Sequence, residues 1–228
     1  MTSKYVILLP GLDGNVDLHA DFMHHAPPDT TVSPISLPDE PLDYAGLCDY
    51  VSAVIENSDA PDSLHLIAES FSGPLAILLA HRKPELIQRL TLVASFAKSP
   101  APWFAHYFPW KQITRRKLPN FAASYYFGVD QELASQLQSA IQSTSPETLE
   151  YRIRSVLKVD VREQLSQFEC PIGYLRATKD RLVPYRASST ILAANKNTVV
   201  HEIEASHLVL QTKPKEAWYR LNNAEYLY

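Results

Sequence analysis

Short apolar stretches recur along the chain, and each is bounded by polar or turn-forming residues. Six of them, five or six residues long and rich in β-branched residues or leucine, predict buried strands: residues 5–9, 31–36, 64–68, 90–94, 172–177 and 199–203. Nearly continuous apolar strands are typical of a parallel sheet that is covered on both faces. The pattern therefore predicts an α/β fold with a mostly parallel sheet of about six strands.

Apolar residues at helical spacing fill most of the intervals between these strands. In residues 42–57 they fall on one side of a helix, and residues 71–81 are dense in leucine, isoleucine and alanine. Alternating strands and helices are joined by right-handed crossovers, which place helices on both faces of the sheet. With 228 residues, the chain fits one large domain that carries an insertion.

The alternation is interrupted once, in residues 98–168, where no comparable strand-like stretch occurs. The later part of this interval has helical spacing in residues 130–142 and 146–157. We therefore expect a core of residues 1–97 and 169–228, with residues 98–168 inserted as a helical lid. The early part is aromatic, and it offers five candidates for a substrate pocket, although such clusters also form the core of a lid: Trp103, Phe104, Phe108, Trp110 and Tyr126.

Charge and cysteine content narrow the classes of partner. The 21 Lys and Arg against 25 Asp and Glu give a net charge of −4 and a pI near 6.1, which argues against a nucleic-acid substrate.

The apolar residues after the N-terminal Met-Thr-Ser-Lys-Tyr are too few for a signal sequence or a membrane span. Two cysteines, Cys48 and Cys170, without a CxxC partner disfavour a disulfide scaffold or a zinc site. We expect a cytoplasmic protein.

The strongest chemical signal is a strand that passes through a serine directly into a helix, in the sequence Leu-Ile-Ala-Glu-Ser-Phe-Ser-Gly around Ser70. A nucleophile at such a turn needs small residues two positions before and after it, because its backbone angles are strained. Ala68 and Ser72 meet this requirement, although they depart from the commoner Gly-x-Ser-x-Gly, and Gly73 allows close packing of helix and strand. The alternative is that Ser70 only caps the following helix.

Two backbone N–H groups are candidates for holding an oxyanion. The helix after Ser70 directs its dipole and free N–H groups at the site, which makes the Phe71 N–H one donor. The first strand ends in a glycine-rich turn, residues 10–14, where parallel sheets place backbone that faces ligands. Leu12 in this turn is the candidate for the second donor, and an ordinary strand-end turn is the alternative.

A base and a carboxylate that could complete a catalytic triad follow Ser70 in the chain. Among eight histidines, His207 follows a strand in a loop, and Asp180 lies in the turn after the preceding strand. Asp180 would accept the Nδ1–H of His207, so that the Nε2 of His207 takes the proton from Ser70. Asp160 is the competing carboxylate, and we interpret it as a helix cap or a surface charge.

Three other histidines lie close together in the sequence, at His19, His24 and His25. Their spacing does not match the i, i+4 pair that binds a metal on a helix. We interpret them as solvated helix positions, and we assign neither a metal nor a cofactor.

The serine turn, the acid and the base together resemble the α/β-hydrolase family, whose triad follows the order Ser, Asp, His, here Ser70, Asp180 and His207. The resemblance covers nearly the whole chain, including the turn at residues 10–14 and the acid loop at residues 178–184. It implies the α/β-hydrolase fold with the strand order 2-1-3-4-5-6, because the family's usual first two strands are missing. It also implies a serine-dependent carboxylic ester hydrolase that acts through an acyl-enzyme on a small or medium acyl ester.

Within the family, the compact size and lid placement are similar to those of bacterial carboxylesterases, including those that demethylate pimeloyl-acyl-carrier-protein methyl ester for biotin synthesis. Residues 98–168 carry nine Lys and Arg against six Asp and Glu, whereas the rest of the chain carries 12 against 19. The similarity implies that an acyl carrier protein docks on this basic lid, with an ordinary charged helical surface as the alternative. The candidate contacts are Arg115, Arg116, Lys117, Arg152 and Arg154.

The same residues are also compatible with three other functions. A thioesterase would differ in its leaving group, and a lyase of this fold would use the serine and histidine for proton transfer without hydrolysis. A catalytically silent binding module would retain the scaffold alone.

Overall fold

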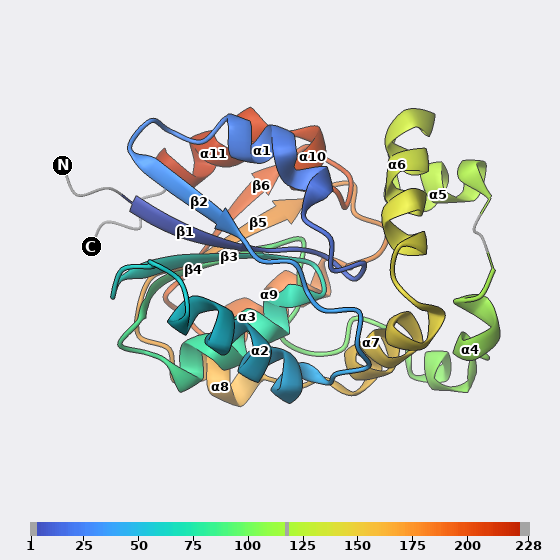
Figure 1. The fold of residues 1–228 in the computed structure, drawn as a ribbon, viewed down its shortest axis with the longest axis horizontal. Coiled ribbons are helices and arrows are strands. Elements are labelled where there is room, and N and C mark those ends of the chain that lie inside the picture. Colours follow the sequence, from blue (N-terminus) through green and yellow to red (C-terminus); the bar gives the residue numbers. More distant parts are fainter. Residues whose placement is uncertain (1–3, 117–118, 224–228) are drawn as a thin grey trace.

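The computed structural model describes residues 4–116 and 119–223 of the chain. Its centre is a parallel sheet with the strand order β2-β1-β3-β4-β5-β6, shown in Figure 1. The strands are β1 (Lys4–Leu9), β2 (Thr30–Pro34), β3 (Leu64–Glu69), β4 (Ile87–Val93), β5 (Ile172–Ala177) and β6 (Thr198–Ile203). The predicted sheet and its strand order are confirmed.

Both faces of the sheet are buried, and β1 shows why its sequence is apolar throughout. Ile7 and Leu9 belong to a larger core cluster on one face, whereas Val6 and Leu8 belong to a smaller cluster on the other. Successive side chains of a strand point to opposite faces, so a strand that is covered on both faces is apolar at most of its positions.

Helices form the outer layers on the two faces, as Figure 1 shows. The smaller cluster lies under α1 (Ala20–His24), α10 (Val209–Thr212) and α11 (Pro214–Asn223). The larger cluster lies under α2 (Tyr44–Glu56), α3 (Ser72–Arg82), α8 (Arg162–Ser166) and α9 (Arg186–Ala194). The first predicted helix begins at Tyr44 rather than Leu42, because Asp43 is extended and its side chain accepts a hydrogen bond from Gly46 N as the N-cap.

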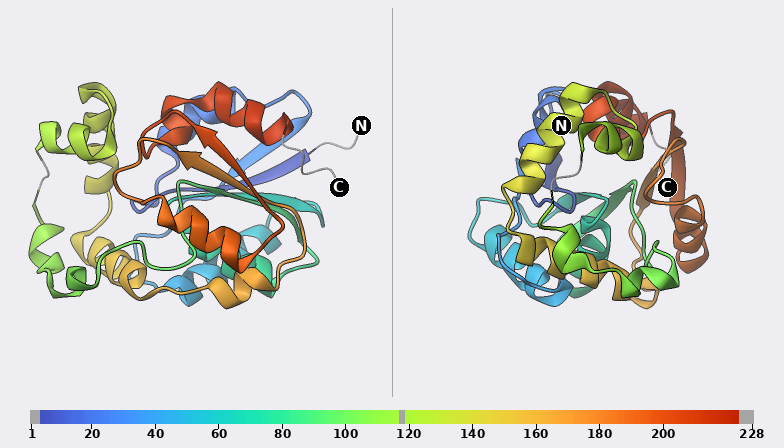
Figure 2. Two further views of the ribbon diagram at one scale, coloured as in Figure 1. Left: turned by 180° about the vertical axis from the view of Figure 1, so that it is seen from behind. Right: turned by 90° about the vertical axis from the view of Figure 1, so that its right-hand side faces the viewer.

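Between β4 and β5 the chain forms a further group of helices beyond the carboxyl ends of the strands, as Figures 1 and 2 show. They are η2 (Trp103–Tyr107), α4 (Trp110–Ile113), α5 (Asn120–Phe127), α6 (Gln131–Gln142) and α7 (Pro146–Lys158). The helix α8 also lies in the interval predicted to be inserted, but it packs against α3 and α9 in the core. The division of the chain into a core and a lid stays a prediction.

The chain enters and leaves this helical group through a narrow neck. Ser99 N donates to Val159 O over 2.9 Å, and Val161 N donates to Ala97 O over 2.8 Å. Lys98 and Asp160 form an antiparallel bridge between these two pairs. The carboxylate of Asp160 also pairs with Arg162, as expected for a surface charge.

Candidate active site

Ser70 lies at the sharp turn between β3 and α3. Its φ of 49° is in the left-handed region, which residues other than glycine rarely adopt. The Ser70 N–H donates to Val93 O over 2.9 Å, and the Ser95 hydroxyl donates to Ser70 O over 2.6 Å. The strained residue is therefore held through both of its backbone polar groups.

Gly73 allows α3 to approach the sheet closely, as the sequence predicts. A Cβ atom at this position would lie 1.8 Å from Ser95 Oγ and 2.7 Å from Ser95 Cβ. The neighbouring Ser72 is fully buried, and its hydroxyl donates to Pro10 O at the end of β1. The two small residues after the turn thus fix Ser70 relative to β4 and to the loop that follows β1.

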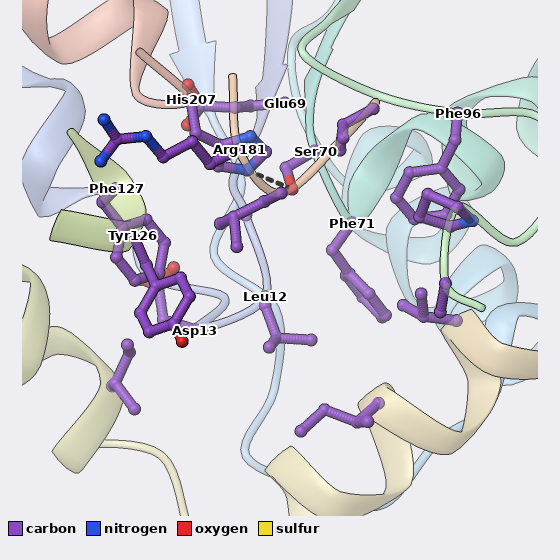
Figure 3. Close-up of a pocket in the computed structure, with 18 of the residues that line it drawn as sticks. Leu12, Asp13, Glu69, Ser70, Phe71, Phe96, Tyr126, Phe127, Arg181 and His207 are labelled. Atoms are coloured by element: carbon purple, nitrogen blue, oxygen red, sulfur yellow. Dashed lines mark hydrogen bonds between the residues drawn. The ribbon is translucent and has the colours of Figure 1, made fainter. Parts of the chain in front are cut away.

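Ser70, His207 and Asp180 form one hydrogen-bonded series. His207 Nε2 lies 2.8 Å from Ser70 Oγ, a hydrogen bond drawn as a dashed line in Figure 3, and His207 Nδ1 lies 2.8 Å from Asp180 Oδ2. The other oxygen of Asp180 accepts from the backbone N–H groups of Leu182 and Val183, which fixes the carboxylate. A carboxylate at Nδ1 keeps the proton on that nitrogen, so the lone pair of Nε2 faces the Ser70 hydroxyl.

The loop after β1 is a tight turn beside this series. Gly14 N donates to Gly11 O over 3.1 Å. Because the C=O and N–H of a trans peptide point in opposite directions, the N–H of Leu12 points away from this turn. Leu12 and Phe71, the two predicted oxyanion donors, both line the same cavity as Ser70.

This cavity has a volume of about 630 Å³ and lies between the carboxyl ends of the strands and the helices of residues 103–158. Four of the five predicted aromatic residues line it, namely Phe104, Phe108, Trp110 and Tyr126. The prediction is wrong for Trp103, which is 76% exposed and lies outside the lining. Successive residues of a 3₁₀ helix are rotated by about 120°, so Trp103 faces solvent where Phe104 faces the cavity. The prediction missed aliphatic residues from α6 and α7 that also line it, among them Leu137, Ile141, Ile153 and Leu157.

A buried polar cluster lines the cavity next to the triad, and the interpretation of His19 as a solvated position is wrong. His19 lies in η1 (Asp17–His19), is 2% exposed, and its Nε2 lies 2.8 Å from Glu69 Oε2. Gln211 Nε2 donates to the same carboxylate oxygen over 2.9 Å. Glu69 itself was a usable signal, because an acidic residue in an apolar strand needs a buried partner.

The pKa values of His19 and Glu69 are shifted in the directions that favour their charged forms. Burial by itself lowers the pKa of His19, but the charge and hydrogen bond of Glu69 act together with the charge of Asp13 and the Val16 backbone, so the pKa of His19 is raised. Burial by itself raises the pKa of Glu69, but the charge and hydrogen bond of His19 act together with the Gln211 hydrogen bond and the charge of His207, so this pKa is lowered. Both shifts favour the ion pair. At the nearby Asp13, burial dominates and raises the pKa of the carboxyl.

The predicted carrier contacts divide into three groups. Arg115, Arg116 and Arg154 are exposed, and Arg154 pairs with Glu150 over 2.8 Å. Lys117 lies outside the described residues. The prediction is wrong for Arg152, which is fully buried and donates to backbone carbonyl oxygens; it lies on the inner side of α7, two residues before the exposed Arg154.

Neither a cluster of metal ligands nor a membrane-spanning helix is present in residues 4–116 and 119–223. In this part of the chain, no three His, Cys, Asp or Glu side chains come together as metal ligands would. No helix within the same ranges has the length and apolar character needed to cross a membrane.

Comparison with known proteins gives consistent matches over almost the full chain. A model of the alpha/beta hydrolase family matches residues 5–221. A pimeloyl-[acyl-carrier protein] methyl ester esterase from Neisseria meningitidis serogroup B is 24% identical, over 97% of this chain and 89% of the relative. A hydrolase structure from Pseudomonas aeruginosa aligns with a TM-score of 0.83 at 16% identity, covering 96% of this chain and 88% of that one. An enol-lactonase structure from Burkholderia xenovorans aligns with a TM-score of 0.80 at 15% identity, covering 100% and 92%.

Proposed function

The chain belongs to the α/β-hydrolase family, and on this premise we propose that it is a serine-dependent carboxylic ester hydrolase. The family and its hydrolase class are as predicted from the sequence. The observation that carries the proposal is the hydrogen-bonded series of Ser70, His207 and Asp180 on the wall of an apolar cavity. Its substrate is a small or medium acyl ester.

The first half of the reaction forms an acyl-enzyme. Ser70 Oγ attacks the ester carbonyl carbon while His207 Nε2 takes the hydroxyl proton. The carbonyl oxygen becomes an oxyanion, which accepts hydrogen bonds from the N–H groups of Leu12 and Phe71. The bond from carbon to the alcohol oxygen then breaks, and His207 returns the proton to the leaving alcohol. Asp180 stabilises the imidazolium in between.

The second half releases the acid. Water attacks the acyl carbon while His207 Nε2 takes one of its protons, and a second oxyanion forms in the same place. The bond from carbon to Ser70 Oγ then breaks, and His207 returns the proton to the serine. The products are one carboxylic acid and one alcohol.

The test uses p-nitrophenyl butyrate and a fluorophosphonate probe. Ser70→Ala removes the nucleophile and should lose both turnover and labelling, whereas Ser72→Ala should still be labelled because Ser72 bonds to Pro10 O instead. Turnover by Ser70→Ala at the rate of the unmodified enzyme would reject the proposal. A folded protein that neither reacts with the probe nor turns over any ester would be a silent binding module.

Product analysis separates the remaining reactions. An esterase yields acid plus alcohol, a thioesterase yields acid plus thiol, and a lyase yields carbonyl-containing cleavage products. A panel of esters and thioesters of graded chain length therefore defines both the leaving group and the acyl length that the cavity of about 630 Å³ prefers.

A carrier-linked methyl ester, with a role in biotin synthesis, is the more specific substrate that we propose. The supporting observation is that Trp110 of α4 lines the cavity, while Lys111 on the same helix and the nearby Arg115 and Arg116 are exposed. We propose that the entrance of the cavity lies beside these basic side chains, which would complement an acidic acyl carrier protein. We propose that this takes place in the cytoplasm, in keeping with two free cysteines.

The carrier proposal is tested by the ratio of kcat/KM for a carrier-linked methyl ester to kcat/KM for the free methyl ester. Arg116→Glu should lower this ratio several-fold at low salt, because it reverses one charge at the entrance. Lys196→Glu is the matched control, since Lys196 is exposed just before β6 begins, at the opposite end of the strands. Equal ratios for the two variants would reject carrier docking on this surface.

A further inference from the structure

Arg152 is a buried side chain that the mechanism above does not use. It belongs to α7 and has 0% exposure. Its Nη1 donates to Leu12 O and its Nη2 donates to Pro38 O, each over 2.8 Å. Its guanidinium also lies over the ring of Phe71, 5.9 Å from the ring centre. One side chain therefore contacts both residues whose N–H groups face the proposed oxyanion.

Gly14 makes room for this guanidinium. Its φ of +77° suits glycine, and a Cβ atom there would lie 2.5 Å from Arg152 Nη1 and 2.9 Å from Nη2. The glycine of the turn and the arginine of the helix thus fit together as one packing unit.

Four consecutive carbonyl oxygens of the turn are held by donors. Gly14 N bonds to Gly11 O, Leu37 N bonds to Gly14 O, and the two carbonyls between them are held by the helix α7 and by the turn that precedes it. Arg152 binds Leu12 O, and the Thr144 hydroxyl donates to Asp13 O over 2.6 Å. Each of these bonds fixes the rotation of one peptide plane.

The rotation of these planes sets where the Leu12 N–H points. The bond to Gly11 O fixes the peptide that contains this N–H, and the bond to Leu12 O fixes the next peptide. If the Leu12 carbonyl is released, the second plane can rotate, and the turn that aims the N–H loosens. Oxyanion donors act through preorganised geometry, so a loosened donor stabilises the transition state less.

We propose that Arg152 is a positioning residue for the oxyanion hole, acting through the Leu12 carbonyl from the inserted helices. This inference rests on the esterase function proposed above. It makes the inserted helices part of transition-state stabilisation in addition to any role in covering the cavity. An arginine is needed, because its rigid fork reaches two carbonyl oxygens at once whereas a lysine offers a single charged group.

The test compares an oxygen ester with its thionoester, in which sulfur replaces the carbonyl oxygen and accepts hydrogen bonds weakly. For Arg152→Met, kcat/KM on p-nitrophenyl butyrate should fall by about 10- to 100-fold, with KM changed by less than about twofold. The ratio of oxygen ester to thionoester should fall with it. This ratio is independent of the folded fraction, because both rates scale with the same amount of active enzyme.

Lys158→Met is the matched control, because Lys158 is a basic residue on the same helix and is exposed. It should keep the ratio of the unmodified enzyme. If Arg152→Met does not fold, Arg152→Lys gives the same measurement and should show a smaller fall in the ratio. An unchanged ratio in the Arg152 variants overturns the inference. The esterase proposal fails by a different result, retained turnover in Ser70→Ala, so the two failures are distinguishable.

Discussion

The imidazole of His19 lies 2.8 Å from the carboxylate of Glu69, and the two side chains are only 2% and 3% exposed. Glu69 directly precedes Ser70, so this ion pair lies immediately beside the proposed nucleophile. Gln211 donates a further hydrogen bond to the carboxylate. Charges buried together in this way depend on each other, because removing one partner leaves the other without compensation.

The first prediction concerns the stability of this pair. Glu69→Gln keeps the shape of the side chain but removes its charge, and it leaves His19 buried without a counter-charge. We expect the free energy of unfolding to fall by about 3 kcal/mol, measured by urea denaturation at pH 6. Glu204→Gln is the control, since Glu204 pairs with Lys179 on the surface, and we expect a change below about 1 kcal/mol. Equal losses in both variants would contradict the prediction.

The second prediction is the pH range over which the pair stabilises the fold. The pKa of Glu69 is lowered from 4.5, so its contribution is present above that pH and is lost as pH falls through the folded pKa. The pKa of His19 is raised from 6.5, so its contribution is full below that pH and is lost as pH rises through the folded pKa. The stability difference between the unmodified chain and Glu69→Gln should therefore be largest between pH 4.5 and 6.5. A difference that stays constant from pH 4 to 9 would show that the pair does not titrate with folding.

The third prediction distinguishes the two carboxylates that compete for the role of triad acid. Asp180→Asn should lower kcat by about 10³- to 10⁴-fold, because an amide next to Nδ1 no longer favours the tautomer with a free Nε2. Asp160→Asn should leave kcat within about twofold, since Asp160 pairs with Arg162 at the surface. The measurement is the initial rate on p-nitrophenyl butyrate, and a larger loss for Asp160→Asn would reverse the assignment.

The fourth prediction concerns the close approach of α3 to the sheet. Gly73→Ala places a methyl group on Ser95, and we expect a loss of about 1–3 kcal/mol in unfolding free energy from overpacking. Combining it with Ser95→Gly removes the atoms in the way and should recover part of that loss, which a double-mutant cycle measures. Gly46→Ala is the control, because the nearest atom there is the end of the flexible Leu42 side chain at 3.3 Å. If the losses in unfolding free energy of Gly73→Ala and Ser95→Gly simply add in the double variant, the contact between residues 73 and 95 is not the cause of the destabilisation.

The sheet could be predicted from sequence because its signal is local. A central strand of the parallel sheet is apolar on both faces, as Val6, Ile7, Leu8 and Leu9 show in β1. Short apolar stretches bounded by turn residues were therefore sufficient to predict it. The order of Ser70, Asp180 and His207 along the chain was also informative, because carboxyl ends of parallel strands meet at one edge. Their hydrogen bonds fit the predicted series, whereas their catalytic roles stay predictions.

Features that depend on how distant segments pack could not be predicted in the same way. From the sequence alone, Arg152 is expected at the surface, as arginines usually are. Its burial is explained only by the approach of Leu12 and Pro38, whose carbonyl oxygens it binds. His19 is paired with a residue 50 positions away. Trp103 and Phe104 are both aromatic, and only the rotation of one short helix decides which of them reaches the cavity.

The neck at Lys98 and Asp160 has a consequence for engineering the enzyme. Its two chain segments are joined by backbone hydrogen bonds, so this connection does not depend on the side chains between them. A transplanted segment would bring a new binding preference, but it would also remove the donor at the Leu12 carbonyl. A foreign segment grafted between Lys98 and Asp160 would therefore yield a fast enzyme only when it also carries a group that restores the bond Arg152 now makes to Leu12 O.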